Sequence, residues 1–334
     1  MRVLTSLPAV LLLALFLPPV QAENRRYLVY EDFTEFLTAA IPPDWAVEDA
    51  NGDGVTWEAV EWGGVRGGPA VRYLSNPGGA ADDWLASPPL ELEPDVDYRV
   101  TFHARVTDPT LPHTLHVLVG TAIGGGETVL NLPAIMNTDP EMQEATFTVD
   151  APGTYYVQFR VTTPADFFAL YLSRIIVSEP EENLELILEL DADFYEPGEP
   201  AVFGEGGEIR CMMLVRNNGT QTVTLNSSLA AGHESDPDAV QAYRVTGPDS
   251  EPVPSRGRIT LVPPLDEDFE EVPPGEAVFA FDDLAESFFD LSAPGVYTVR
   301  AVYRNVHLPE TGTAWRGKLV SEPVSFTIEE EPAP

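Results

Sequence analysis

The sequence predicts an all-β protein in which short strands build sandwiches of the jelly-roll kind. Thirty-two prolines and 25 glycines interrupt the 334-residue chain at short intervals. Between these breaks lie runs rich in β-branched and aromatic residues, such as DYRVTFHARV, HTLHVLVGTA and TYYVQFRVTT. Short strands separated by frequent turn signals are typical of β-sandwiches and jelly rolls.

The run at 97–106 shows the period of a half-buried strand. Tyr98, Val100, Phe102 and Ala104 alternate with polar side chains. Successive side chains of a strand point to opposite faces, so these four residues should face a core.

Residues 1–22 have the features of a secretory signal peptide. Arg2 supplies a positive start, the apolar run LPAVLLLALFLPPV follows, and small residues precede an expected cleavage after Ala22. This run, like every later one, falls short of the roughly 18 apolar residues that suggest a membrane span. We therefore expect a secreted or cell-surface protein, or a periplasmic one in a bacterium, with no membrane insertion after signal cleavage.

The mature chain is long enough for two domains. We predict a first β-domain at 23–178, an acidic, proline-containing linker at 179–185 and a second β-domain at 186–329. The tail at 330–334 is predicted to be disordered.

Local patterns add further expectations. In the second half, EIRCMMLVRNNGTQTVTL predicts two strands around an Asn-Asn-Gly turn. Two segments, 31–40 and 281–291, are the only candidates for short helices. Cys211 lies in an apolar strand-like run and is the sole cysteine, so we expect a buried, inert thiol and no internal disulfide.

The net charge of −36 limits the choice of partners. Fifty-four acidic residues face 18 basic ones. Such a chain is repelled by nucleic acid and by anionic membranes, which excludes both as partners. The acidity fits either a solvated surface or a cluster of carboxylates that binds a cation.

Three segments of the first domain follow one another in an order known from one family: IPPDWAVEDANGDGVTW, GGAADDWLASPPLELEPDVDYRVTFHARV and APGTYYVQFRV. Over about residues 27–178 the chain resembles the choice-of-anchor J domains, also called cleaved-adhesin-like domains, which are related to MAM-type jelly rolls. The resemblance implies an extracellular bacterial jelly roll, commonly a non-catalytic adhesin or carbohydrate-binding module, often with calcium. The second domain resembles an Ig-like β-sandwich, which implies a fold and little about function.

The loop DANGDG raises the question of calcium. Asp49, Asn51 and Asp53 stand at alternate positions before Gly54, as in an EF-hand, but Val60 occupies the position of the bidentate Glu. A β-loop needs only convergent oxygens and a further carboxylate from elsewhere in the fold.

Two interpretations of this loop remain open. In one, Asp49, Asn51 and Asp53 hold a structural Ca²⁺ together with Asp82 or Asp83, which lie in the other polar cluster that the resemblance highlights. In the other, the loop is a turn whose Asx side chains cap their own backbone. The resemblance implies acidic residues just after the Phe of the first strand and in the last strand, where this chain has Thr34, after Phe33, and Ser173 and Arg174. If relatives use those positions for calcium, we expect that second site to be absent here.

The tryptophans suggest anchors and one contact residue. Trp45, Trp57 and Trp84 fall at the motif positions and are expected in the core. Trp62 lies in the glycine-containing stretch VEWGGVRGGP, which suits either sugar stacking or ordinary packing.

Motifs of catalysis are missing from the sequence. It has no Gly-x-Ser-x-Gly and no His-Glu-x-x-His, and the pair His113 and His116 is expected at a polar surface. We therefore expect a non-catalytic binding or adhesion protein that recognises a glycan or a cell-surface protein. The alternative is a structural or assembly component of the envelope or matrix, without a small ligand.

Overall fold

The computed structural model describes residues 23–34, 40–165, 167–190, 209–228, 241–254, 264–283, 289, 291 and 293–328. The predicted signal peptide, with its cleavage point, and the tail at 330–334 lie outside these residues. All regular elements of the described residues are β-strands or single 3-10 turns, so the prediction of an all-β protein is confirmed. In this part of the chain no helix has the length and hydropathy that crossing a bilayer requires.

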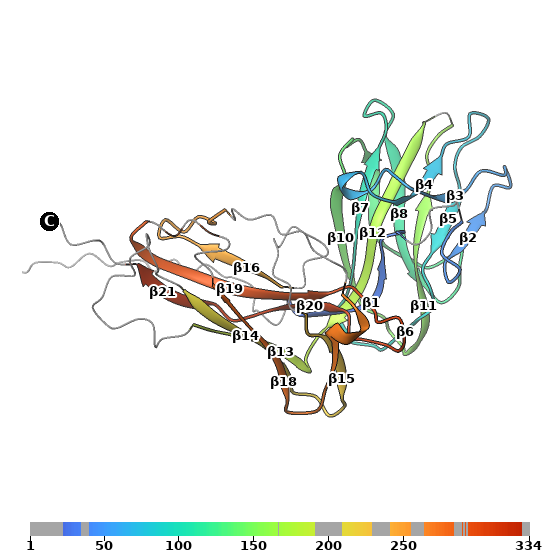
Figure 1. The fold of residues 1–334 in the computed structure, drawn as a ribbon. Coiled ribbons are helices and arrows are strands. Elements are labelled where there is room, and N and C mark those ends of the chain that lie inside the picture. The colour runs from blue at the N-terminus through green and yellow to red at the C-terminus, as the bar shows by residue number, and fades with distance from the viewer. Residues whose placement is uncertain are drawn as a thin grey trace, which may run out of the picture.

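The first twelve strands form a two-layer sandwich (Figure 1). One layer has the order β10-β7-β12-β1, with β4 on β12 and β3 on β4. The other has the order β2-β5-β11-β8-β9, with β6 on β11. The strands are β1 (Arg25–Glu31), β2 (Ala46–Asp49), β3 (Trp57–Val60), β4 (Ala70–Leu74), β5 (Asp83–Ala86), β6 (Leu90–Leu92), β7 (Tyr98–Val106), β8 (His113–Gly120), β9 (Glu127–Ile135), β10 (Glu141–Phe147), β11 (Gly153–Val161) and β12 (Ala169–Pro180).

The core of this sandwich follows the period-two pattern of the sequence. Along β7 buried residues alternate with half-buried ones, and Phe102 meets Phe159 of β11 edge-on at 5.1 Å between ring centroids. The prediction that Trp45, Trp57 and Trp84 are buried is confirmed. Burial of such large apolar side chains between two sheets supplies the main stabilisation of a sandwich.

The remaining strands enclose a second core. It is formed by strands of three ladders: β13-β14-β18, β15-β17, and β16-β19 with β20 and β21 on β19. Cys211 is buried there, as predicted, and its thiol donates to the Tyr243 hydroxyl at 3.3 Å. The strands are β13 (Leu184–Leu190), β14 (Arg210–Asn217), β15 (Val223–Asn226), β16 (Gln241–Thr246), β17 (Phe269–Val272), β18 (Ala277–Asp283), β19 (Gly295–Asn305), β20 (Gly317–Val320) and β21 (Val324–Ile328).

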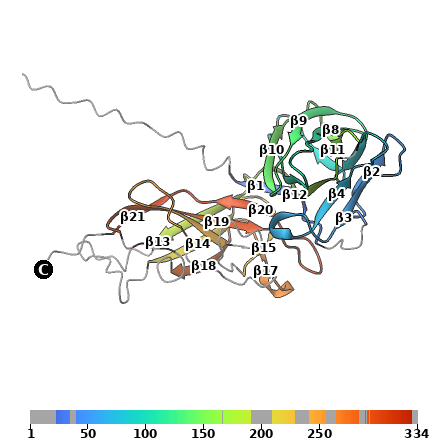
Figure 2. The same ribbon diagram turned by 90° about the horizontal axis from the view of Figure 1, so that it is seen from above.

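One sheet runs through both cores. At the start of β1, Arg25 and Arg26 pair with Lys318 and Gly317 of β20, which gives the order β10-β7-β12-β1-β20-β19-β16. Figures 1 and 2 show β1 and β20 side by side where the two units meet. The chain crosses from β12, which ends at Pro180, to β13 in three residues.

Glu181 fixes this crossing. Its Oε1 accepts the backbone N–H of Asn183 at 2.8 Å and of Leu184 at 3.3 Å, and its Oε2 accepts the Trp315 indole N–H at 2.7 Å. A buried carboxylate that accepts several N–H groups stays satisfied without a cation.

Three local predictions meet the structure differently. The two strands predicted around Asn-Asn-Gly are confirmed as β14 and β15, and each pairs elsewhere: β14 pairs with β13 and β18, and β15 pairs with β17. A helix from residue 281 is wrong at its start, since 281–283 end β18, and 284–288 lie outside the described residues. In the segment 31–40, Glu31 ends β1 and 35–39 are not described.

Candidate functional site

The loop between β2 and β3 satisfies its own backbone. Asp49 Oδ1 accepts the N–H groups of Gly52 and Asp53 at 2.8 and 3.2 Å, and its Oδ2 accepts that of Gly54 at 2.8 Å. Both glycines are in the left-handed region, with φ of 70° and 79°. The loop is thus an Asx-capped turn in this structure, which is the second of the two interpretations open from the sequence.

Asp53 connects this loop to the segment that precedes β5. Its Oδ1 accepts Val55 N–H at 2.8 Å, and its Oδ2 accepts the amide groups of Asn76 and Asn51 at 2.9 and 3.2 Å. The hydrogen bond from Val55, followed by those from Asn76 and Asn51, lowers the pKa of Asp53. Asn51 also donates to Ala80 O at 2.7 Å. The loop therefore presents an ionised Asp53 next to two side-chain amides.

Asp82 and Asp83 have different surroundings. Asp82 forms a bidentate pair with Arg160, with Nε to Oδ1 at 2.7 Å and Nη2 to Oδ2 at 3.0 Å. The same guanidinium lies over the Trp84 ring, 5.0 Å from its centroid. Because Arg160 neutralises Asp82 and occupies both of its carboxylate oxygens, metal ligation by Asp82 would require this ion pair to break.

Asp83 is the unusual carboxylate of this corner. Its side chain is fully buried, and Oδ1 has no hydrogen-bond partner. The residue stands opposite Asp49 in the β2–β5 ladder, and the buried Tyr73 hydroxyl lies beside it. Burial, with the charges of Asp49 and Asp53, raises the pKa of Asp83 to about 6 although Tyr73 favours its ionised form. A neighbouring negative charge disfavours the ionised form of a buried carboxyl group.

The structure thus brings Asp49, Asp53 and Asp83 into electrostatic contact, while Asp82 is engaged elsewhere. Across the described residues no three His, Cys, Asp or Glu side chains are grouped as a preformed metal site. Calcium ligation by these residues requires the loop to exchange some of its Asx hydrogen bonds, and it stays a prediction.

Trp62 lies on the outer face of the large sheet. Its side chain is 51 % exposed and its ring centroid is 5.3 Å from that of the buried Tyr171 of β12. Arg105 of β7 lies over the same Tyr171 ring at 4.4 Å and donates from Nε to Gly63 O at 2.7 Å. Gly63 has φ of 108°, and a Cβ there would collide with Tyr171. The indole is therefore exposed and held in place.

The sequence did not single out Arg105 and Tyr171, the two residues that hold Trp62 in place. Arg105 belongs to the polar face of 97–106, so its place outside the core was available from the strand period. Its contact with Tyr171, 66 positions later, depends on the β7–β12 pairing, which no local pattern gives.

His113 is a further correction. We expected a polar surface, but its side chain is fully buried, and Nε2 lies 2.5 Å from Phe167 O and Nδ1 3.1 Å from Thr163 Oγ1. Burial lowers its pKa despite the contact with Phe167 O. The neighbouring apolar residues of β8 bury the backbone there, and two polar partners make a neutral imidazole acceptable in the core.

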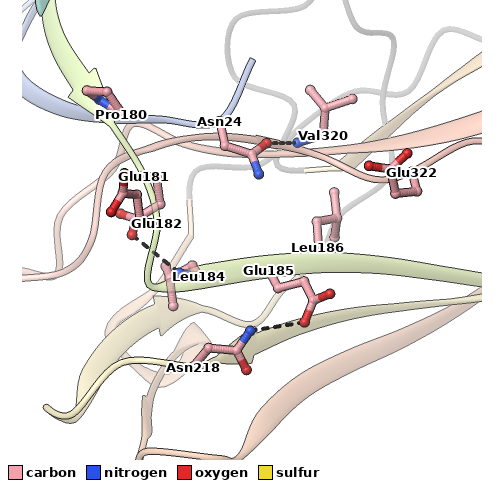
Figure 3. A pocket seen from close by; sticks show the side chains of 10 residues that line it. All are labelled: Asn24, Pro180, Glu181, Glu182, Leu184, Glu185, Leu186, Asn218, Val320 and Glu322. Atoms are coloured by element: carbon pink, nitrogen blue, oxygen red, sulfur yellow. Dashed lines mark hydrogen bonds between the residues drawn. The ribbon is translucent and has the colours of Figure 1, made fainter. Parts of the chain in front are cut away.

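A pocket of about 370 Å³ lies at the joint of the two units (Figure 3). Two of the four glutamates that line it have structural partners: Glu181 fixes the crossing, and Glu185 accepts the Asn218 amide at 3.0 Å and lies 3.8 Å from Arg216. Asn24 accepts Val320 N–H at 2.8 Å from the opposite wall. We therefore interpret this pocket as part of the contact between the two units and not as a ligand site.

Comparisons with known proteins give structural likeness only. No family model matches the chain, and no curated protein matches it. Two cleaved adhesin domains of Lys-gingipain from Porphyromonas gingivalis, K1 and K3, are similar in structure at 20 % identity, with TM-scores of 0.37 and 0.39. They cover 45 % and 46 % of this chain and 96 % and 98 % of their own.

A third similar structure is the CBM22-1 xylan-binding domain of Paenibacillus barcinonensis Xyn10C, at 12 % identity and a TM-score of 0.37. It covers 48 % of this chain and 98 % of its own. TM-scores below 0.5 at such identities do not establish a shared family or function. The choice-of-anchor J assignment therefore remains a prediction.

Proposed function

We propose that this protein is a secreted or cell-surface, non-catalytic binding protein that recognises a glycan. The observation that carries the proposal is the exposed Trp62, whose ring packs at a tilt against the buried Tyr171 ring that Arg105 also covers. A large aromatic side chain that is half in water offers apolar surface that a partner can cover. A rigid indole gives a flat apolar face at little entropic cost, which suits the apolar face of a sugar ring.

A glycan array probed with the full chain tests the proposal, followed by titration calorimetry of each hit. We expect Trp62→Ala to weaken binding at least tenfold. The matched control is Phe279→Ala, because Phe279 is 59 % exposed but lies on β18 of the other unit.

The control variant should bind like the unchanged chain. Glycan binding that survives Trp62→Ala would refute the role of this residue. A chain that binds no glycan but captures a cell-surface protein, or neither, would favour protein recognition or a structural role in the envelope or matrix.

We propose in addition that a Ca²⁺ ion stabilises the corner formed by Asp49, Asp53 and Asp83. Three points support it: the carboxylate oxygens are the donors that calcium prefers, Asp83 has a buried oxygen without a partner, and none of the described residues places a cation beside this group of charges as Arg160 is placed beside Asp82. Asn51 would contribute its amide oxygen after a flip of the amide group.

A further inference from the structure

A second pocket, of about 400 Å³, lies on the large sheet where β1 meets β20. Its walls come from six neighbouring strands of that sheet, in the order β10-β7-β12-β1-β20-β19. Figure 1 shows these strands side by side at the junction of the two units. The pocket is therefore built by both units, with side chains far apart in the sequence.

The pocket collects positive charge in a strongly acidic protein. Five of the 18 basic residues line it, against two carboxylates, an excess of 5 − 2 = 3 positive charges. One of the carboxylates, Glu23, already accepts from Arg244 at 2.7 Å and Arg300 at 3.5 Å. The other, Glu144, stands 3.7 Å from one guanidinium. The five cations are Arg25, Arg99, Arg174, Arg304 and Lys318.

A bulge brings Arg174 to this face. Between Ser173 and Ile176 the β7–β12 register shifts, and Arg174 has a left-handed φ of 47°. Leu172 and Ile175 on either side are fully buried in the core. Strict alternation from Leu172 would turn residue 174 to the core, so the bulge and its strained backbone keep this guanidinium out of the core.

The cations act on one another. Burial, followed by the charge of Arg99, lowers the pKa of Arg25 to about 10. Burial, followed by the charge of Arg174, lowers the pKa of His103. Such repulsion is relieved when an anion enters.

Two buried polar atoms of the lining have no hydrogen-bond partner, Arg99 Nε and His103 Nδ1. Arg99 and His103 are four residues apart and lie on the same outer face of β7, on either side of Thr101. Buried polar groups are normally satisfied, so these two atoms leave hydrogen-bonding capacity unused in the wall of the pocket.

We propose that this pocket binds an acidic sugar, a saccharide ring that bears a carboxylate or a sulfate group. Arg99 and Arg174 face the oxyanion, and a rotation of the Arg99 and His103 side chains would turn their buried, unpartnered nitrogens toward it. The volume exceeds that of a lone oxyanion, and the lining adds the Tyr27 and Tyr30 rings. Aromatic rings beside guanidinium groups suit a ring with one apolar face and one charged substituent.

This inference rests on the proposed function only in taking the ligand to be a glycan. Arg105, beside Trp62, and Arg99 share the outer face of β7 six residues apart, or about 20 Å at the usual rise of a strand. An acidic oligosaccharide along this face can reach both Trp62 and the pocket. The two sites are tested separately, Trp62 by Trp62→Ala with glycans from the array and the pocket by Arg99→Gln with acidic sugars.

The test is titration calorimetry of the full chain with glucuronate and with glucose 6-sulfate, using glucose and inorganic sulfate as controls. We expect at least one acidic sugar to bind at least tenfold more tightly than glucose and than sulfate, and to weaken as salt rises. Arg99→Gln should weaken that binding at least tenfold. Arg216→Gln, on β14 of the second unit, is the control and should leave it unchanged.

Outcomes that overturn the proposal are distinct. Equal binding of sulfate and the acidic sugars would reduce the site to a simple anion site. Absence of acidic-sugar binding, or capture of acidic peptides in place of sugars, would refute it, even if neutral glycans still bind through Trp62. Thermal melting of Arg99→Gln checks its folding, and the comparison of probes on the unchanged chain needs no variant.

Discussion

Replacing Asp83 by asparagine should change stability in opposite directions with and without calcium. Burial raises the pKa of Asp83 from 3.8 to about 6, so in the ion-free protein near pH 7.5 this charge destabilises the folded state. A shift of about two units corresponds to about 3 kcal/mol at about 1.4 kcal/mol per unit. Asp83→Asn removes the charge at nearly constant volume, so in EDTA it should raise the free energy of unfolding by up to this amount.

The sign also fixes a pH window. A carboxyl group with a raised folded pKa gives stability that is fully present below about pH 4 and is lost as the pH rises through about 6. The advantage of Asp83→Asn in EDTA should therefore grow between pH 4 and pH 7 and then level off.

Calcium reverses the comparison. An ion that binds only the folded state adds roughly 2.7 kcal/mol at 100 times its Kd. The unchanged chain should gain this stability, and Asp83→Asn should lose most of the gain, because the negative charge is gone and an NH2 group, which cannot ligate a cation, replaces one of the two carboxylate oxygens. Thermal and urea unfolding at pH 7.5, in EDTA and in excess Ca²⁺, measure both effects.

Asp82→Asn is the matched control. It breaks the pair with Arg160 and should lower stability modestly, by the same amount in both solutions. Equal calcium shifts in the unchanged chain and in Asp83→Asn would refute the proposed ligation. A loss of stability in EDTA on Asp83→Asn would refute the view that the charge is unfavourable there.

Two further predictions concern buried polar groups. His113 has a lowered pKa in the folded protein, so the unfolded chain binds the proton first and the free energy of unfolding should fall as the pH drops below about 6.5. His113→Gln should show a smaller fall between pH 7 and 5.5. Urea unfolding at several pH values measures this, and an equal fall in the variant and the unchanged chain would contradict it. Glu181→Ala leaves the Trp315 indole and two backbone N–H groups without their acceptor, and calorimetric melting should show a loss of at least about 2 kcal/mol, whereas exposed Glu182→Ala should change little.

The parts of the fold that the sequence predicts are those set by local period. Alternation in 97–106 places the faces of β7 correctly, and the buried Trp57 follows from its size and position. The pairing of β1 with β20 joins residues almost 300 positions apart, and no period in either strand indicates it. For the same reason the sequence predicts the strands on either side of Asn-Asn-Gly but not their partners, because a turn signal gives a change of direction and leaves the partner of each strand open.

The candidate sites divide in the same way. The turn at DANGDG is local, and its Asx chemistry is readable from six residues. Asp82 pairs with Arg160 and Asp83 is buried because adjacent side chains at β5 point to opposite faces. Arg160 comes from β11, 77 positions beyond Asp83, so no local pattern indicates this pair. Trp62 stands out by its glycine neighbours, but its rigidity depends on Tyr171, which only tertiary pairing reveals.

The shared sheet gives the proposed acidic-sugar pocket a consequence that separate domains would lack. Arg304 and Lys318 come from β19 and β20 of the second unit, whereas Arg99 and Arg174 come from the first. A ligand that contacts both sets binds only when the β1–β20 pairing is intact, so binding stabilises the joint itself. Acidic sugar should then raise the melting of the two units together, while Ca²⁺ at the Asp83 corner, which β2, β5 and the loop after β2 build within the first unit, should act on that unit alone.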